Sequence, residues 1–214
     1  MENETNPLGN DIKAVVFDCD GVMFDSAEAN RRYYDAVLAR FGKPPMDEQD
    51  FAYAHMHTAF ETLERLFGSG EGLKKALKAA KDLTYFPFVR LMRMEPYLMH
   101  LLTWLKPNYH LAVATNRTNT MDAVISEHGL TGFFDLVVTS MDVKAPKPDP
   151  GQLYKIMEAY SLSGDQVAYL GDSVVDEQAA RTAGVKFVAV ANPNLEADVH
   201  IKMLVEMEDI LGRP

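Results

Sequence analysis

The chain has 214 residues, of which 47% are apolar and 24% charged, and its 31 acidic residues against 21 basic ones give a net charge of −10. This apolar share excludes a mainly disordered chain, and the acidic balance argues against nonspecific nucleic-acid binding, because phosphate backbones attract basic surfaces. The single cysteine excludes an internal disulfide framework, and no apolar run reaches the ~20 residues of a membrane span. We therefore expect a cytoplasmic globular protein, without nucleic-acid or membrane partners, that begins with a frayed tail over residues 1–11.

Five short, valine-rich apolar segments lack the alternation of half-exposed strands, and they lie at 12–17, 111–114, 136–138, 167–170 and 187–190. Such segments are typical of strands buried on both faces of a parallel sheet. Between the later segments, apolar residues recur at helical spacing, as in the stripe of Leu98, Leu101, Leu102 and Leu105. Alternating strands and helices predict an α/β fold with right-handed crossovers.

The stretch from 21 to about 93 differs, because it shows only helical stripes and no strand pattern. The stripes lie at 33–41, 56–67 and 73–80, with turn-forming residues at 42–45 and 68–72. Roughly 70 residues are too many for an ordinary connection between strands. We expect a small helical domain over residues 23–92, inserted into a core formed by residues 1–22 and 93–214.

Acidic residues follow two of the predicted strands. Asp18 and Asp20 end the first strand, where the period of two lets both side chains point the same way. Asp172 and Asp176 follow the fourth strand and lie on one side of a helix if that helix begins near Ser173. Helix capping alone also favours aspartate at such positions. Because the carboxyl ends of parallel strands line one crevice, the four carboxylates together predict a site for a hard divalent cation, most naturally Mg²⁺.

Two further strand ends add groups that suit a phosphate ligand. The second strand runs into Thr115 and Asn116, a pair that more often forms only the turn before a helix. After the third strand, Lys147 lies between two prolines just before a predicted helix, which presents it rigidly. With such a set, one carboxylate can attack phosphorus while Mg²⁺ and the lysine neutralise the phosphoryl oxygens and a second carboxylate moves the proton.

In chain order, these groups resemble the motifs of the haloacid dehalogenase superfamily in its phosphatase branch: Asp18-Cys-Asp20-Gly-Val, Thr115-Asn116, Pro-Lys147-Pro and Gly171-Asp172-Ser-Val-Val-Asp176. Each motif is weak alone, but all of them in order at strand ends are specific. The resemblance implies a Rossmann-like core, with a five-stranded parallel sheet in the order 3-2-1-4-5. It also identifies the helical insertion as the family's cap.

The resemblance implies a role for each motif residue. Asp18 would be the nucleophile that forms an aspartyl-phosphate, and Asp20 the general acid that later acts as the base. Thr115, Asn116 and Lys147 would bind the phosphoryl oxygens. Mg²⁺ would be held by Asp18, by the backbone carbonyl of Asp20 and by Asp172. Asp176 would either support the metal through water or orient Lys147, and the sequence leaves both possibilities open.

Three functions are compatible with these motifs. The first is a Mg²⁺-dependent phosphatase that acts on a small phosphorylated metabolite, since Asp20 argues against dehalogenation, whose halide leaving group needs no proton. The second is a sugar-phosphate mutase similar to β-phosphoglucomutase, although that branch usually carries a histidine and a glutamate where this chain has Asn30 and Gly171. The third is a phosphoacceptor module without enzymatic activity, which would not need the large helical insertion.

Substrate choice is expected to depend on the cap, because it closes over the leaving group. The candidate contacts in this region are His55, His57, Arg65, Arg31 and Arg32. A single histidine or arginine on a helix is more often a surface group, so the sequence does not decide among them.

Overall fold

The structure, a computed structural model, describes residues 7–9 and 11–212, apart from the side chains of His55 and Met56. At its centre is a six-stranded sheet in the order β5-β4-β1-β6-β7-β8. All neighbouring strands of this sheet are parallel. The strands are β1 (Ala14–Phe17), β4 (His110–Thr115), β5 (Leu136–Thr139), β6 (Val167–Gly171), β7 (Lys186–Val190) and β8 (Val199–Ile201).

The α/β class and the order of the five predicted strands are confirmed, because 3-2-1-4-5 corresponds to β5-β4-β1-β6-β7. Strand β8 extends the sheet at one edge, where Val199 pairs with Val188 of β7. It has only three residues, Val-His-Ile, which are too few to show the pattern of a strand. Strand β8 is therefore recognised from its pairing with β7 and not from a pattern in the sequence.

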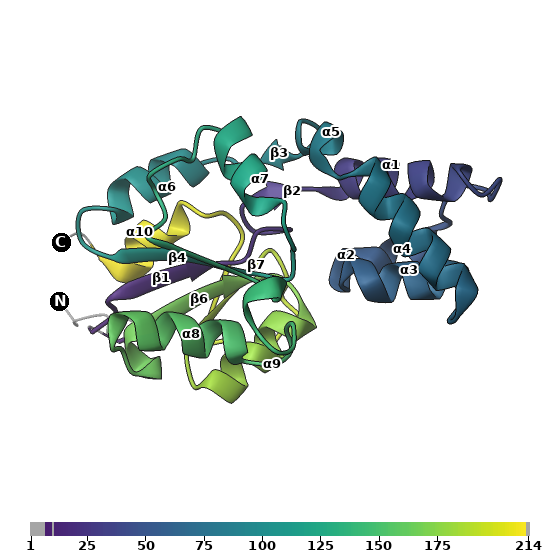
Figure 1. Cartoon of the computed structure of the whole chain (residues 1–214). Coiled ribbons are helices and arrows are strands. Elements are labelled where there is room, and N and C mark those ends of the chain that lie inside the picture. Colours follow the sequence, from purple (N-terminus) through teal and green to yellow (C-terminus); the bar gives the residue numbers. More distant parts are fainter. Residues whose placement is uncertain (1–6, 10, 213–214) are drawn as a thin grey trace.

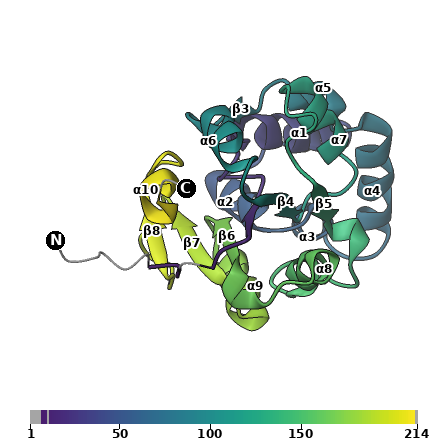
Figure 2. The ribbon, with the colours of Figure 1, turned by 90° about the vertical axis from the view of Figure 1, so that its left-hand side faces the viewer.

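Helices cover both faces of the sheet (Figures 1 and 2). Alternate residues of β1 explain why, since Val15 and Phe17 belong to one buried cluster and Ala14 and Val16 to the other. The first cluster is covered by α6 (Leu98–Leu105), α7 (Met121–Glu127) and α10 (Glu206–Leu211), and the second by α8 (Gly151–Tyr160) and α9 (Val174–Ala183). Two 3₁₀ turns, η1 (Ser140–Asp142) and η2 (Gly164–Gln166), complete the connections. Within 7–9 and 11–212, no helix is both long and apolar enough to cross a membrane.

A helical unit stands beyond the carboxyl edge of the sheet and is joined to it through two short strands (Figure 1). These strands, β2 (Phe24–Asp25) and β3 (Arg93–Met94), form an antiparallel pair. Between them lie α1 (Ala27–Ala39), α2 (Glu48–Met56), α3 (Ala59–Phe67), α4 (Glu71–Leu83) and α5 (Phe86–Val89). The unit has its own buried cluster, which includes Tyr33, Val37, Leu63 and Ala76. We propose that it is the cap, with the bounds 23–92 expected from the sequence.

Three local expectations are wrong. The stretch after residue 21 contains a strand, β2 at 24–25, whose two residues are too few to show a pattern. The stripe at 56–67 is not one helix, because α2 ends at Met56 and Thr58 begins α3 in a capping box with Glu61. That Thr-x-x-Glu spacing is a sequence signal for the break. In the expected tail, Leu8 is only 1% exposed and packs against the core, whereas residues 1–6 and 10 lie outside the described residues.

The apolar face of α6 provides a test of this packing. Leu102 is fully buried, whereas Met99 on the same helix is 40% exposed. Replacing Leu102 with alanine leaves a cavity against the sheet, and we expect the free energy of unfolding to fall by about 2–5 kcal/mol. Met99→Ala, the matched control, should change it by less than about 0.5 kcal/mol. Urea unfolding of both variants measures the difference, and equal losses would contradict the packing described.

Candidate active site

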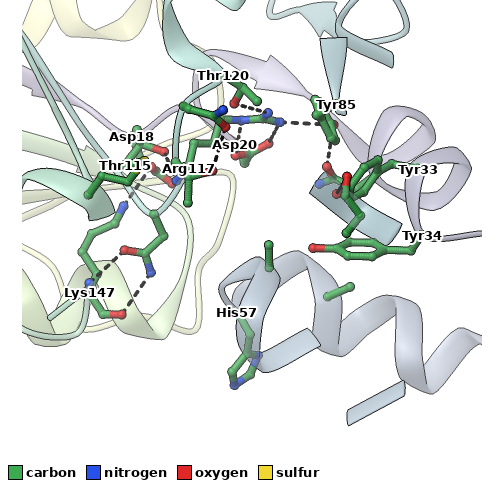
Figure 3. A pocket seen from close by; sticks show the side chains of 18 of the residues that line it. Asp18, Asp20, Tyr33, Tyr34, His57, Tyr85, Thr115, Arg117, Thr120 and Lys147 are labelled. Atoms are coloured by element: carbon green, nitrogen blue, oxygen red, sulfur yellow. Dashed lines mark hydrogen bonds and ion pairs between the residues drawn. The ribbon is translucent and has the colours of Figure 1, made fainter. Parts of the chain in front are cut away.

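The carboxyl ends of β1, β4 and β6 meet at one edge of the sheet and form the floor of a cavity of about 410 Å³ (Figure 3). Asp18 comes directly after β1, Thr115 ends β4, and Asp172 follows β6. The cavity lining contains six of the seven residues to which the motifs gave a catalytic, phosphate-binding or metal role, namely Asp18, Asp20, Thr115, Asn116, Lys147 and Asp172. The seventh, Asp176, is fully buried beneath the floor.

Lys147 lies at the centre of this floor and its side chain is only 2% exposed. Its Nζ donates hydrogen bonds to Asp176 Oδ1 at 2.7 Å, to the hydroxyl of Tyr169 at 2.8 Å and to the carbonyl of Ala114 at 3.0 Å. The same Nζ forms an ion pair with Asp18 Oδ1 at 2.8 Å. Four protein oxygens therefore surround the ammonium, and the positive charge is placed against Asp18.

Asn116 holds the backbone of Lys147 on both sides of its α-carbon. Its Oδ1 accepts a hydrogen bond from the Lys147 N–H at 2.8 Å, and its Nδ2 donates to the Lys147 carbonyl at 3.0 Å. The side chain of Asn116 is thus engaged with Lys147 in this structure. Its expected contact with phosphate stays a prediction.

Asp176 fixes the position of the Lys147 ammonium. Its Oδ1 accepts from Lys147 and, at 2.6 Å, from the hydroxyl of Tyr169, and its Oδ2 accepts from the backbone N–H and the hydroxyl of Ser173. Burial alone would raise the pKa of Asp176, but Lys147 and these hydrogen bonds outweigh it and hold the pKa below its ordinary value. Tyr169 was not singled out from the sequence. The only signal for it is a hydroxyl-bearing residue within an otherwise apolar strand.

Three carboxylates gather around this lysine. Asp18, Asp172 and Asp176 each offer an oxygen atom that lies within 4.8 Å of the other two. Burial raises the pKa of Asp18 to about 7, although Lys147 opposes the shift. Burial, followed by the charges of Asp176 and Asp18, raises the pKa of Asp172 to about 8. At both carboxyl groups, burial and the neighbouring negative charges thus outweigh the one ammonium of Lys147.

The residues present fit a bound Mg²⁺. Three ionised carboxylates against one ammonium leave two negative charges, which one divalent cation balances. The donors are all oxygen atoms, the ligands that Mg²⁺ prefers. Asp18 Oδ1 is buried and, apart from its ion pair with Lys147, receives no hydrogen bond. Asp172 lies so close to the loop after β1 that any Cβ at Gly21 would overlap its carboxylate.

Asp20 lies in the same cavity but meets a different cation. Arg117 donates from Nε to Asp20 Oδ2 at 2.7 Å and from Nη2 to Oδ1 at 2.6 Å, which is a bidentate pair. The Asp20 side chain is accordingly not one of the three carboxylates that gather around Lys147. Its expected contribution to the metal, through the backbone carbonyl, stays a prediction. Arg117 was not singled out from the sequence, although it directly follows Thr115 and Asn116 at the same strand end.

Thr115 is 1% exposed at the end of β4. Its Oγ1 accepts a hydrogen bond from the backbone N–H of Arg117 at 3.1 Å, and its carbonyl accepts from Nε2 of the buried Gln152 at 2.8 Å. These two contacts fix the hydroxyl at the floor of the cavity, where the sequence predicted a phosphate-binding group.

The helical unit forms the opposite wall of the cavity, with Tyr33, Tyr34, His57, Tyr85 and Phe86 in its lining. Of the basic residues suggested from the sequence, His57 is in this lining and stacks on Tyr53, with its Nδ1 2.9 Å from the Tyr53 carbonyl oxygen. The arginines form ion pairs away from the lining: Arg31 with Glu48, Arg32 with Glu28 and Arg65 with Asp50. The side chain of His55 lies outside the described residues.

The family profile described as haloacid dehalogenase-like hydrolase matches residues 15–190. The chain belongs to this hydrolase family. It is 28% identical over 187 residues to phosphoglycolate phosphatase 1 of Pseudomonas aeruginosa, which covers 83% of this chain and 69% of that protein. It is 25% identical to the pyrophosphatase PpaX of Bacillus velezensis, covering 94% of this chain and 95% of that protein. Among solved structures, a haloacid dehalogenase superfamily hydrolase of subfamily IA, variant 1, from Geobacter sulfurreducens is 37% identical with a TM-score of 0.80, covering 95% of this chain and 98% of that one.

The match confirms the family that the four motifs indicated, and it includes every motif residue from Asp18 to Asp176. The protein is therefore an enzyme of the haloacid dehalogenase-like hydrolases. Its parallel sheet has the arrangement expected from that resemblance.

The raised pKa values of Asp18 and Asp172 generate a prediction about metal binding and pH. Without metal, the folded protein binds more protons than the unfolded chain from roughly pH 4 to 8, so these groups lower its stability as the pH rises through that range. A bound Mg²⁺ would take the place of the protons on the carboxyl groups of Asp18 and Asp172. We therefore expect Mg²⁺ to raise the melting temperature of EDTA-treated protein more at pH 8.5 than at pH 5.5.

Differential scanning fluorimetry at the two pH values measures this response. Asp172→Asn is the control, because it removes one of the carboxylates and should abolish most of the response at both pH values. A Mg²⁺ response that is equal at both pH values, or larger in acid, would contradict the account of the carboxylates given above.

Proposed function

We propose that the protein is a Mg²⁺-dependent phosphatase that hydrolyses a small phosphomonoester through an aspartyl-phosphate on Asp18. The observation that carries this proposal is the position of Asp18 at the floor of the cavity, 2.8 Å from a buried ammonium and within reach of two further carboxylates. The phosphatases among its relatives support the same class of reaction.

In the first half of the reaction, an oxygen of the Asp18 carboxylate attacks phosphorus. The bond between phosphorus and the ester oxygen breaks as the new bond forms, and Asp20 donates a proton to the leaving oxygen. Asp20 suits this task because it lines the same cavity yet lies apart from the three carboxylates around Lys147. Lys147 and the hydroxyl of Thr115 would bind the phosphoryl oxygens as charge develops on them.

In the second half, Asp20 is a carboxylate and takes a proton from water, whose oxygen attacks phosphorus. The bond from phosphorus to Asp18 breaks, which releases inorganic phosphate and restores both carboxyl groups to their starting forms. The closed wall formed by the tyrosines of the helical unit would keep other water away from the intermediate.

Mg²⁺ would be held by Asp18, by Asp172 and by the backbone carbonyl of Asp20. When bound, it supplies positive charge that balances the oxygens of the phosphoryl group. We assign Asp176 to the positioning of Lys147, because both of its oxygens already accept hydrogen bonds from protein donors. This assignment chooses between the two roles that the sequence left open.

A small phosphorylated metabolite fits the site better than a polymer. The cavity of about 410 Å³ is lined by aromatic side chains on one wall and by charged groups on the floor, which suits a ligand of modest size. The net charge of −10 disfavours nucleic acid as a partner. A cytoplasmic location is part of the same proposal and is supported by the single cysteine, Cys19, which is buried and unpaired.

Two positions argue against the sugar-phosphate mutase. A Cβ at Gly171 would lie 2.8 Å from Cγ of Asp176, so a glutamate there would displace the carboxylate that holds Lys147. Asn30, which stands where the mutases usually have histidine, accepts a hydrogen bond from the Tyr85 hydroxyl at 2.6 Å and donates one to Ser26. A phosphoacceptor without enzymatic activity is not supported, because the chain belongs to a hydrolase family.

Replacing Asp18 with asparagine tests the mechanism. The variant keeps the shape of the side chain but loses the nucleophilic oxygen, so we expect turnover of p-nitrophenyl phosphate with Mg²⁺ to fall about a thousandfold or more. EDTA should abolish the activity of the unmodified protein. Release of inorganic phosphate measures both effects.

The matched control is Asp122→Asn, because Asp122 is exposed on the first turn of α7. It should leave turnover unchanged, and both variants should melt cooperatively. Full activity in the Asp18→Asn protein would refute the aspartyl-phosphate mechanism.

A further inference from the structure

The pair between Arg117 and Asp20 conflicts with the role proposed for Asp20. Both oxygens of the carboxylate accept hydrogen bonds from the guanidinium, at 2.6 and 2.7 Å. A bidentate pair with arginine is among the strongest contacts that a carboxylate makes. A carboxylate whose two oxygens are both held in this way cannot turn either of them toward the ester. The pair must therefore open before the first half of the reaction.

Contacts that do not involve Asp20 hold Arg117 at the cavity wall (Figure 3). Its Nη1 donates to Thr120 Oγ1 and its Nη2 to the Tyr85 hydroxyl, both at 3.4 Å, and its Cζ lies 4.9 Å from the centre of the Tyr85 ring. The Arg117 carbonyl accepts from the backbone N–H and from the hydroxyl of Ser140, each at 3.1 Å. Because none of these contacts involves Asp20, we expect them to hold the guanidinium in place when Asp20 turns away.

The guanidinium then needs another anion. Its side chain is only 8% exposed, and a buried charge without a partner is costly. Burial lowers the pKa of Arg117, but Asp20 outweighs burial and holds the pKa well above its ordinary value, so the group stays charged. Asp18 and Asp172, the other carboxylates in the described lining of the cavity, lie in the cluster around Lys147. A replacement anion must therefore arrive with the ligand.

We propose that Arg117 holds both oxygens of Asp20 away from the ester until a second acidic group of the substrate takes the place of Asp20 in the bidentate pair. Asp20, once released, carries a proton taken from a hydronium ion of the solvent to the leaving oxygen while the bond from Asp18 to phosphorus forms. The proton that Asp20 later removes from the attacking water returns to the solvent when the pair with Arg117 forms again. Arg117 is then a positioning residue for Asp20 that also recognises the leaving group. This inference rests on the proposed phosphatase function and narrows its substrate class.

The substrate class follows from the geometry. Arg117 touches the same carboxylate that must reach the ester oxygen, so the second acidic group has to be attached within a few bonds of that oxygen. A bidentate partner for a guanidinium is a carboxylate or a phosphate. The expected substrates are small phosphomonoesters whose leaving alcohol carries one of these groups.

Four phosphate esters, tested as substrates of the unmodified protein, show whether a carboxylate or a second phosphate on the leaving group is required. Phosphoglycolate carries a carboxylate, ethylene glycol bisphosphate carries a second phosphate, and 2-hydroxyethyl phosphate has a neutral alcohol of similar size. The aryl leaving group of p-nitrophenyl phosphate departs without a proton, so the first half of its reaction does not need Asp20. We expect kcat for at least one acid-bearing ester to exceed kcat for the neutral ester by about a hundredfold. The better acid-bearing ester identifies which anion replaces Asp20.

The variant Arg117→Ala should remove this preference. We expect kcat/KM for the acid-bearing ester to fall about a hundredfold, while kcat for 2-hydroxyethyl phosphate and for p-nitrophenyl phosphate stays the same or rises, because Asp20 is no longer held. Arg117→Lys should restore part of the preference. Lys81→Ala is the matched control, since Lys81 is an exposed cation of the same cavity lining, and it should change the preference by less than about threefold.

Several outcomes would overturn the inference. One is a kcat in the unmodified protein that is the same, within about threefold, for acid-bearing and neutral esters, a comparison that needs no variant to fold. Others are an equal loss on all probes in Arg117→Ala, or a loss confined to KM, which would make Arg117 a structural or simple binding residue. If the unmodified protein releases no phosphate even from p-nitrophenyl phosphate, the proposed function itself fails. Activity on that ester without any acid preference refutes only the role of Arg117.

Discussion

The buried ammonium of Lys147 is the interaction on which the site depends. It donates hydrogen bonds to the carbonyl of Ala114 in β4, to the hydroxyl of Tyr169 in β6 and to Asp176 in α9. It also forms an ion pair with Asp18 after β1. One side chain thus ties together the strand ends that form the floor of the cavity. Breaking such a buried pair by removing one partner typically costs about 3–5 kcal/mol, because the remaining charge is left without compensation. The same positive charge of Lys147 would stabilise the negative oxygens of a bound phosphate group.

Two aspartates that are only two residues apart have different surroundings. Asp18 lies in the group of carboxylates around Lys147, where one ammonium does not balance the negative charge, and this imbalance favours a divalent cation. Asp20 lies against Arg117, where one guanidinium meets one carboxylate. Pairs of titratable groups in contrasting surroundings are how active sites separate two chemical roles. In the mechanism that we propose, the division between nucleophile and proton carrier would follow from which cation each aspartate meets.

Much of this arrangement could be predicted from local patterns. Strands β1, β4, β6 and β7 are buried on both faces and therefore form continuous apolar segments in the sequence. Asp18, Thr115 and Asp172 lie where three of these segments end. Elements that depend on pairing rather than on pattern were missed, namely β8 at the sheet edge and the two-residue strands β2 and β3. The break between α2 and α3 was also missed, although the capping box from Thr58 to Glu61 marks it in the sequence.

The sequence by itself determined the fold class, the residues at the strand ends and the preference for a hard cation, because each follows from local spacing and from side-chain chemistry. Only the tertiary structure decided how the charges pair. Arg117 and Asp20 are 97 positions apart, and they meet because β4 and β1 are neighbours in the sheet. Tyr169, within an apolar strand, joins the lysine network for the same reason. The attraction between two charges weakens as the distance between them grows. The strand order therefore sets the partner of each carboxylate, because it decides which charges lie close together, and the motif that contains the carboxylate does not.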